Sequence, residues 1–279
     1  MTPPQPASPR ARIAFIGGGN MASAIIGGLV RQGEEPGRIT VVEPLAAARE
    51  RLAADFGLRP EAAPGPALHG SDLVVWAVKP QVFREAALAA APHSAAALHL
   101  SVAAGIGSDS IAHWLGSERI VRAMPNTPAL VGRGVTGLFA RAAAGAADRA
   151  LVDRVLEPTG ARVWVEREAQ LDAVTALSGS GPAYVFYFLE AMQQAGAELG
   201  LPPAQALELA MATFAGAAHL AAQSGEPPAV LRERVTSKGG TTFAAIGVLD
   251  AADVRNHFAA AIRAAHDRAQ ELGTEFGKG

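Results

Sequence analysis

The sequence contains no cysteine and only three lysines among its 279 residues, although it has 21 arginines. The lack of cysteine excludes thiolate nucleophiles, disulfide bonds, iron–sulfur clusters and cysteine-ligated zinc. The arginine excess and the 62 alanines have the pattern of a GC-rich coding preference, so an alanine-rich stretch says little about structure. A lysine is more informative about function because it has been kept despite this coding preference. The three lysines are Lys79, Lys238 and Lys278.

Strong charge of one sign and long apolar runs are also missing. The net charge is −2, which gives no general attraction to nucleic acid. Residues 86–108 lack formal charges, but Pro92, His93 and His99 interrupt them, so we expect no membrane-spanning segment. Residues 1–11 lack the apolar core of a secretory signal and predict a short disordered tail. We therefore expect a cytoplasmic protein without nucleic-acid or membrane partners.

Between residues 12 and 167, short apolar runs alternate with helical stretches. Runs that are apolar throughout are typical of a parallel sheet covered by helices on both faces. Their alternation with helices predicts a doubly wound α/β domain. The expected strands are residues 12–17, 39–43, 72–78, 97–103, 119–124, 135–140 and 162–166.

Residues 168–279 contain no convincing strand, and this region predicts an all-α domain. Tyr184, Phe188 and Met192 form an i, i+4, i+8 stripe, which indicates core or interface packing rather than a binding box. Alanine-rich helices pack closely and often pair with a second copy, so we expect a homodimer. The expected helices are residues 171–177, 182–199, 203–223 and 253–272.

The stretch IGGGNMA at residues 16–22 lies between the first expected strand and a helix that runs to about Arg31. It fits G-x-G-x-x-[GA], in which Gly17 allows the turn, Gly19 lets the backbone approach a pyrophosphate, and Ala22 keeps helix and strand close. The helix N-terminus offers free N–H groups and a positive dipole end to the phosphates. An ordinary tight turn is the alternative, but the position after the first strand favours a Rossmann-type dinucleotide site.

Glu43 ends the second expected strand and is a candidate partner of the adenosine ribose. A carboxylate there accepts hydrogen bonds from ribose hydroxyls and repels a 2′-phosphate, which favours NADH. The alternative is a solvated acid before Pro44. Arg49 and Arg51 follow within two helical turns and are able to bind a phosphate. The choice between NADPH and NADH therefore stays open.

Three further motifs follow expected strands, where doubly wound sheets bind ligands. AVKPQ at residues 77–81 contains the rare Lys79, whose backbone is restricted because proline follows it. SVAAG contains Ala103 and Ala104, which leave room for a flat nicotinamide. MPNTP is a rigid turn whose Asn126 offers donors and an acceptor. A solvated surface lysine is the alternative for Lys79.

Two loops of small residues precede helices in the second region, LSGSGPAY at 177–184 and TSKGGTT at 236–242. Such loops bind anions through backbone N–H groups, although ordinary helix caps look the same. Two of them beside a dinucleotide fold favour a substrate carboxylate site that includes Ser180. The seven histidines are scattered without metal-binding spacing, so we expect no metal. No proton-transfer dyad is evident, which suits hydride transfer to an electrophilic substrate.

These motifs, together with DAVTALSGSGPAY, resemble the pyrroline-5-carboxylate reductases in order and spacing from about Arg12 to about Leu272. The resemblance implies a Rossmann domain, an interlocking helical dimer domain, and in many members decamers. It implies reduction of L-1-pyrroline-5-carboxylate to L-proline by NADPH or NADH, with hydride attack at the imine carbon, which becomes C5 of L-proline. The chain departs from many members at Glu43, and it lacks an asparagine that they carry within residues 60–71.

The resemblance also implies residue roles. It places the pyrophosphate at Ile16, Gly17, Gly18, Gly19, Asn20 and Met21. It places the cofactor ribose and nicotinamide at Ala77, Val78, Lys79, Pro80, Val102, Ala103 and Ala104. It places the substrate at Glu168, Ser237, Gly239, Gly240, Thr241 and Thr242. Thr242, which donates a hydrogen bond to the ring nitrogen, and Lys79 are the candidate catalytic residues.

Other classes remain open. A β-hydroxyacid dehydrogenase has the same two-region plan but would need a lysine in the early helices of the second region, and residues 171–223 contain none. An imine reductase or a non-catalytic dinucleotide-binding protein would also fit the glycine motif. An assay of NADH and NADPH oxidation with pyrroline-5-carboxylate separates these classes.

Overall fold

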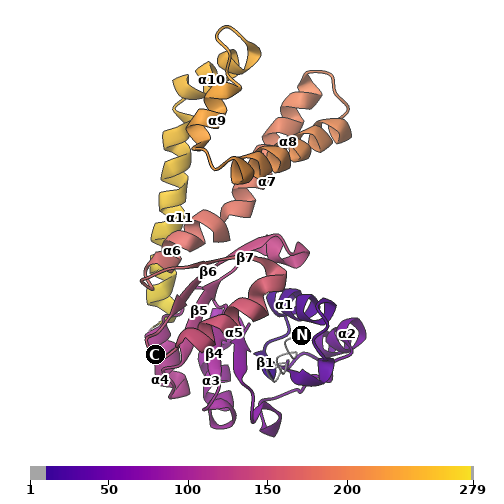
Figure 1. The fold of residues 1–279 in the computed structure, drawn as a ribbon, viewed down its shortest axis with the longest axis vertical. Helices are drawn as coiled ribbons and strands as arrows, with labels where there is room; N and C mark the ends of the chain where they lie inside the picture. Colours follow the sequence, from indigo (N-terminus) through magenta and orange to yellow (C-terminus); the bar gives the residue numbers. More distant parts are fainter. Residues whose placement is uncertain (1–10, 278–279) are drawn as a thin grey trace, which may run out of the picture. The chain divides into compact units, whose positions relative to one another are not determined.

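In the computed structural model, which describes residues 11–277, seven strands form one sheet in the order β2-β1-β3-β4-β5-β6-β7 (Figure 1). Every expected strand is confirmed to within a few residues. The first five strands run parallel, and β2, β1 and β3 pair in register at Val42, Ile16 and Trp76. The strands are β1 (Ile13–Ile16), β2 (Ile39–Val42), β3 (Leu73–Trp76), β4 (Leu98–Ser101), β5 (Ile120–Met124), β6 (Gly134–Ala140) and β7 (Gly160–Trp164).

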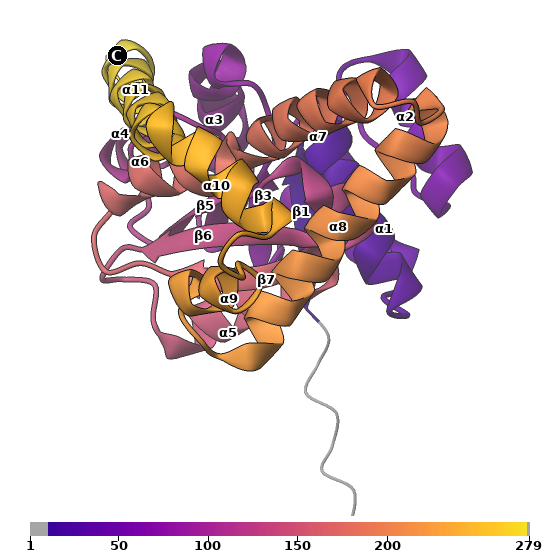
Figure 2. The same ribbon diagram turned by 90° about the horizontal axis from the view of Figure 1, so that it is seen from above.

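The sheet is not parallel throughout, so that part of the expectation is wrong. Strand β6 pairs antiparallel with β5, and β7 then pairs parallel with β6 beside it (Figure 2). The cause is the connection between β5 and β6, residues 125–133, which holds only the short 3₁₀ helix η3 (Thr127–Val131). A parallel pair needs a crossover of about a dozen residues or more, usually an α-helix.

Helices cover both faces of the sheet because alternate strand residues point to opposite sides. Ile13 and Phe15 pack on one face with Ile25 of α1. Ala14 and Trp76 pack on the other face, in a cluster that includes residues of α3 and α4. The helices of this part of the chain are α1 (Asn20–Arg31), α2 (Ala46–Phe56), α3 (Pro80–Ser94), α4 (Ser108–Leu115), α5 (Ala146–Leu156) and α6 (Gln170–Val174).

The chain divides into two compact units, whose described residues are 11–179 with 265–277 in the first and 180–264 in the second. The division differs from the expected boundary at residue 168. Helix α6 packs against β5 and β6, and the end of α11 reaches Gly105, so both segments group with the sheet. Residues 1–10 of the proposed tail, and Lys278, lie outside the described residues.

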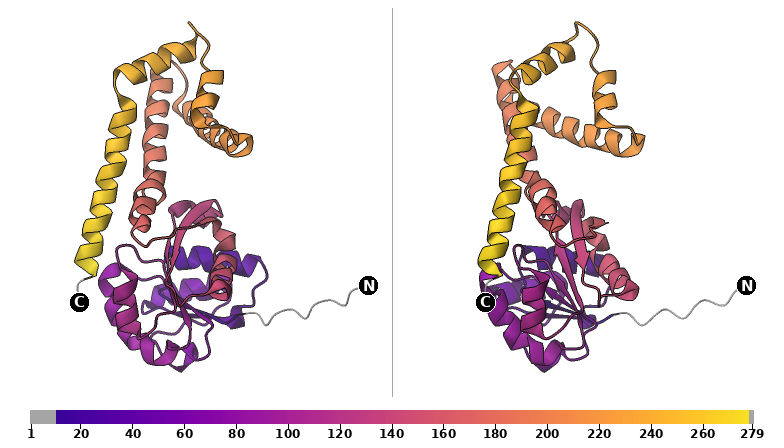
Figure 3. Two further views of the ribbon diagram at one scale, coloured as in Figure 1. Left: turned by 60° about the vertical axis from the view of Figure 1, so that its left-hand side comes forward. Right: turned by 90° about the vertical axis from the view of Figure 1, so that its left-hand side faces the viewer.

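The second unit is helical, as expected, and Figure 3 draws it in salmon to yellow. Helix α7 packs against α8. The expected aromatic stripe is an internal packing surface in part, because the rings of Tyr184 and Phe188 both lie 5.6 Å from that of Phe258. The helices are α7 (Gly181–Glu198), α8 (Pro203–Ser224), α9 (Pro228–Arg234), α10 (Thr241–Ala251) and α11 (Val254–Phe276), the last of which continues into the first unit.

Within residues 11–277, no helix has the length and apolar character needed to cross a membrane. No group of three or more histidine, aspartate or glutamate side chains in that range is arranged to hold a metal ion.

A histidine side chain is buried on β4 in the sheet. His99 on β4 is 1% exposed, and its Nδ1 accepts a hydrogen bond from Trp76 Nε1 at 3.2 Å. Its Nε2 has no partner among the described residues. Burial, assisted by the nearby charge of Arg119, lowers the pKa of His99 from 6.5 to about 4. The folded chain therefore holds this imidazole neutral.

We expect His99 to make the fold sensitive to acid. Between pH 6.5 and about pH 4 the unfolded chain protonates His99 and the folded chain does not, so the free energy of unfolding falls as the pH falls. The loss approaches about 3 kcal/mol at the acid end. Urea unfolding of the wild type and of His99→Asn, which keeps an acceptor for Trp76, measures it. The variant should lose less stability than the wild type over this range, whereas the exposed-site control His113→Asn should match the wild type. Equal losses for wild type and His99→Asn would contradict the assignment.

Candidate active site

The predicted cofactor motifs gather at one edge of the sheet. Parallel strands place their carboxyl ends at the same edge, and the strand order reverses direction between β1 and β3, where doubly wound folds bind ligands. The glycine motif follows β1, Glu43 follows β2, and Lys79 follows β3. The 102–104 segment follows β4, and Asn126 follows β5. The sheet thus brings together five segments that are distant in sequence.

The glycine motif is shaped by close backbone contacts. Gly17 has φ +95°, and a Cβ there would lie 2.6 Å from the Ala77 carbonyl oxygen. A Cβ at Gly18 would lie 2.5 Å from Leu52 Cδ1. Around a Cβ at Gly19, by contrast, no atom lies within 4 Å. The loop is therefore packed against the protein at its first two glycines and open at the third, as a pyrophosphate needs.

The first turn of α1 is free to receive an anion. Asn20 begins the helix with Gly19 as N-cap, and the first helical bond runs from Ser23 N–H to the Gly19 carbonyl. The N–H groups of Asn20, Met21 and Ala22 precede that bond and have no acceptor in the helix. No acidic residue belongs to this turn itself.

Glu43 lies beneath this loop rather than open to solvent. Its carboxylate is 7% exposed and accepts hydrogen bonds from the Gly18 N–H at 2.8 Å and the Leu45 N–H at 2.9 Å. The alternative of a solvated acid is wrong. Glu43 instead links the end of β2 to the glycine loop, and its remaining lone pairs are available to a ribose hydroxyl.

A groove of about 310 Å³ opens beside Gly17. Its wall beyond β2 is held by the 61–64 segment, because Glu61 N–H donates to the Val41 carbonyl and Glu43 N–H donates to the Glu61 carbonyl. An apolar groove next to an open glycine turn fits the adenosine half of a dinucleotide. The lining residues are Ile16, Gly17, Val42, Pro44, Ala62, Ala63, Pro64, Val78, Val82, Glu85, Ala86 and Ala89.

Arg49 and Lys79, two cations near the carboxyl ends of the strands, differ in whether their side chains already have partners. Arg49 is turned back on the backbone, where its Nη1 donates to the carbonyls of Glu43 and Pro44. Lys79 has the extended backbone that the following Pro80 predicts, with φ −65° and ψ 147°. Its side chain is exposed and makes no ion pair within residues 11–277. Lys79 therefore remains available to a ligand.

The segment expected at the nicotinamide is held at its start by two hydrogen bonds from its backbone N–H groups. Val102 N–H donates to the Trp76 carbonyl, and Ala103 N–H donates to Ser101 Oγ at 3.3 Å. Ala103 is buried, whereas Val102 and Ala104 are half-buried and present the surface that a ligand can reach.

The Asn126 side chain has two backbone partners. Its Oδ1 accepts from Val135 N–H at 2.9 Å, and its Nδ2 donates to the Ser178 carbonyl at 3.1 Å. The amide therefore ties the β5–β6 turn to the LSGSG segment. A direct contact with the cofactor stays a prediction.

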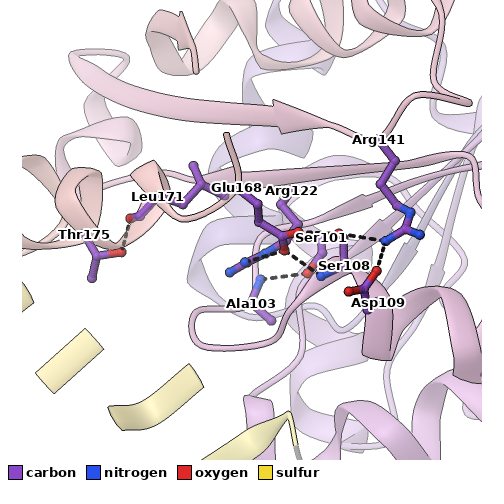
Figure 4. Close-up of polar contacts among 9 residues, drawn as sticks. All are labelled: Ser101, Ala103, Ser108, Asp109, Arg122, Arg141, Glu168, Leu171 and Thr175. Carbon is purple, nitrogen blue, oxygen red and sulfur yellow. Dashed lines mark hydrogen bonds and ion pairs between the residues drawn. The ribbon is translucent and has the colours of Figure 1, made fainter. Parts of the chain in front are cut away.

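Glu168 has partners that sequence patterns did not reveal. Its carboxylate accepts from Ser108 N–H at 2.6 Å and from Arg122 Nη1 at 2.8 Å, as Figure 4 shows. A pocket of about 160 Å³ beside it is lined in part by Gly105, Arg122 and Asp172. Burial raises the pKa of Asp172, and the charges of Arg122 and His266 oppose the rise. Ser108 and Arg122 stand apart from any motif, so only the fold could place them here.

The 237–242 loop of the second unit prepares a helix start. Gly239 has φ +77°, and Gly240 N–H donates to the Ser237 carbonyl at 3.0 Å. Helix α10 then begins at Thr241 without a side-chain cap, so the N–H groups of its first turn are free of helical acceptors. Ser180 similarly precedes α7 and makes no capping bond.

The fold and the glycine loop define an oxidoreductase class that binds a nicotinamide dinucleotide on a Rossmann-type sheet. A family model described as pyrroline-5-carboxylate reductase dimerisation matches residues 168–272, and one described as NADP oxidoreductase coenzyme F420-dependent matches residues 12–105. A pyrroline-5-carboxylate reductase of Pseudomonas aeruginosa is 43% identical over 269 residues, covering 96% of this chain and 98% of its own. The chain belongs to the pyrroline-5-carboxylate reductase family.

Solved structures agree with this assignment. A pyrroline-5-carboxylate reductase from Coxiella burnetii superposes with a TM-score of 0.88 at 38% identity, covering 94% of this chain and 98% of its own. The Plasmodium falciparum enzyme, solved with NADP bound, gives 0.84 at 26% identity, with 95% and 98% covered. The chain is an oxidoreductase that uses NADH or NADPH.

The match to a dimerisation domain shows a homo-oligomer. It covers helices whose large apolar side chains lie exposed in the single chain, among them Phe186, Tyr187, Phe243 and Val248. Packing against a second copy would remove these side chains from water.

Gly19→Ala tests the pyrophosphate cradle. The backbone there is extended, with φ −73°, and the space around a Cβ is open, so the variant should fold with the wild-type melting temperature. The methyl group would stand where the pyrophosphate must approach, and we expect NADH affinity to fall at least about tenfold by fluorescence titration. Gly37→Ala also meets no atom within 4 Å and is the matched control, which should bind as the wild type does. Wild-type affinity in Gly19→Ala would place the cofactor elsewhere.

Proposed function

We propose that this chain reduces L-1-pyrroline-5-carboxylate to L-proline, the last step of proline synthesis, through residue roles divided between its two units. The observation that carries the proposal is the glycine loop, closed at Gly17 and open at Gly19, in a chain that belongs to this reductase family. The first unit, with the expected domain 12–167, holds the cofactor. The second, within the expected domain 168–279, supplies the substrate loop and the dimer contact.

In the first unit, the N–H groups at the start of α1 bind the pyrophosphate, and Lys79 compensates its charge. Val102 and Ala104 form the surface for the nicotinamide ring. When bound, the reduced nicotinamide supplies the hydride. Glu43 fixes the glycine loop through the Gly18 N–H and accepts from the ribose. These roles rest on where each residue lies along the carboxyl edge.

In the second unit, the loop Ser237 to Thr242 binds the substrate carboxylate. The free N–H groups at the start of α10 and the helix dipole favour an anion there. The Thr242 hydroxyl donates a hydrogen bond to the ring nitrogen, which keeps the imine polarised and its C=N carbon electrophilic. Ser180, at the start of α7, offers a second hydroxyl to the substrate.

The groove beside Gly17 favours a cofactor with a free 2′-hydroxyl. In the described part of the chain, Glu85 is the one charged residue that lines the groove. The buried Glu43 lies between two further lining residues, Val42 and Pro44. Arg49, the nearest cation along the chain, already donates to two carbonyls. A 2′-phosphate would therefore meet the negative charges of Glu85 and Glu43, which supports NADH over NADPH.

Outside the sites, the family likeness supports assembly of dimers into decamers, and the composition supports a cytoplasmic location without a nucleic-acid partner. Size-exclusion chromatography with light scattering measures the assembly.

Thr242 should act through its hydroxyl. Thr242→Val removes the donor at nearly constant volume and should lower kcat/KM for pyrroline-5-carboxylate about 10- to 100-fold, with NADH affinity unchanged. Thr242→Ser keeps the hydroxyl and should recover most of the loss. Steady-state NADH oxidation measures both. Equal activity of Thr242→Val and wild type would remove this hydroxyl from the mechanism, and no activity in the wild type would overturn the proposed reaction.

Cofactor preference should follow the charge of the groove. We expect NADPH to bind at least about fivefold more weakly than NADH in fluorescence titrations of the wild type. Leu45 is 68% exposed, so Leu45→Arg adds a cation near the end of β2 without disturbing the core. This variant should lower the ratio of the NADPH Kd to the NADH Kd. Val163 is 52% exposed and lies on β7, at the opposite end of the strand order from β2. Val163→Arg adds the same charge there and should leave the ratio of the NADPH Kd to the NADH Kd unchanged. Tighter binding of NADPH by the wild type would contradict the proposed preference.

A further inference from the structure

The loop between β4 and α4, residues 102–107, ends at a helix start that has no side-chain N-cap. Helix α4 begins at Ser108, and its N-cap residue is Gly107, which has no side chain to accept from the first N–H groups. A helix start without a cap leaves its first N–H groups unsatisfied and its entry path free to move. Ser108 is nevertheless buried, so its N–H needs an acceptor from elsewhere.

Glu168 is that acceptor, 60 residues further along the chain. Its Oε1 accepts the Ser108 N–H at 2.6 Å, and its Oε2 accepts the Ser108 hydroxyl at 2.5 Å. A carboxylate at a helix N-terminus also interacts favourably with the helix dipole. Glu168 therefore caps α4 in place of the residue at the usual position, and it fixes the end of the 102–107 loop.

Two arginines hold this cap in place, and Figure 4 shows both pointing into it. Arg122 on β5 donates to Glu168 Oε1 at 2.8 Å, which balances the carboxylate charge. Arg141 donates to Ser108 Oγ at 3.0 Å and pairs with Asp109 and Glu118. With three hydrogen bonds to its carboxylate, Glu168 is held by the protein itself.

The other side of the loop is held by the end of α11. Gly105 has φ +74°, and a Cβ there would lie 3.3 Å from Phe276 and 3.4 Å from the Leu272 carbonyl oxygen. Ser110 Oγ donates to the Gly277 carbonyl at 3.0 Å. The loop is thus fixed on two sides, and Val102 and Ala104 keep one position.

We infer that Glu168 is a positioning residue that holds the 102–107 loop in place for the nicotinamide through its bonds to Ser108. The inference rests on the proposed function, which assigns Val102 and Ala104 to the nicotinamide. It replaces the sequence-based expectation that Glu168 binds the substrate. The two roles differ in what they disturb, because a positioning residue affects the nicotinamide half of the cofactor and a substrate contact affects pyrroline-5-carboxylate.

Glu168→Gln tests the inference, since it removes the charge that balances Arg122 and one of the two acceptors for Ser108. We expect the Kd of NADH to rise about tenfold and kcat to fall about tenfold. The Kd of ADP, which reports only the adenosine half of the site, should stay within about twofold of wild type. Titration calorimetry for ADP, fluorescence for NADH and steady-state kinetics measure the three values.

Two variants complete the experiment. Ser108→Ala removes the hydroxyl bond to Glu168 and the bond from Arg141 but keeps the Ser108 N–H bond to Glu168, so it should move NADH affinity and kcat the same way by a smaller factor. Glu166→Gln removes an exposed charge two residues away and should match the wild type. A higher KM for pyrroline-5-carboxylate with unchanged NADH affinity would make Glu168 a substrate contact and overturn the inference. A wild-type Kd of NADH and a wild-type kcat in Glu168→Gln would also overturn the inference. If Glu168→Gln does not fold, the same wild-type values in Ser108→Ala would overturn it. A wild type that binds NADH but does not reduce the substrate would contradict the proposed function instead.

Discussion

The contact between the glycine loop and the end of β3 sets the geometry on which the cofactor site depends. The Gly17 backbone lies so close to the Ala77 carbonyl that a side chain has no room, and its positive φ turns the chain directly from β1 into α1. Because β1 and β3 are neighbours in the sheet, this turn brings the helix N-terminus to the point where the strand order reverses. The Glu43 carboxylate then holds the same loop from β2 through the Gly18 N–H. The open space at Gly19 follows from these two constraints.

Features that depend on neighbouring residues could be predicted from the sequence. The strands were evident as apolar runs, and the extended backbone of Lys79 follows from the proline after it. The helices at residues 80–94, 108–115 and 146–156 were expected only as helical stretches without bounds, because alanine obscures their periodicity and α4 has a glycine in place of a cap. The shape of the glycine loop, closed at Gly17 and open at Gly19, could also be predicted from its motif, since the roles of these glycines are local.

Features that depend on distant partners could not be predicted. Strand β6 runs antiparallel to β5 because the connection between them is short, and no sequence motif predicts that reversal. Glu43 looked like an exposed acid or a ribose partner, and its bond to the Gly18 N–H became evident only once β2 lay beside β1. Glu168, Ser108 and Arg122 come from three separate elements, so their network arises from the fold alone. A motif that matches a family can thus name a site residue without giving its partner.

The proposed reaction depends on hydride transfer from the bound cofactor to the imine carbon of the substrate, which becomes C5 of L-proline. NADH carrying deuterium at both C4 positions tests it, with unlabelled pyrroline-5-carboxylate as substrate and the product analysed by mass spectrometry and NMR. We expect L-proline with one deuterium at C5, formed in equal amount to the NADH consumed. NADH consumption without C5-deuterated proline, or no consumption at all, would contradict it.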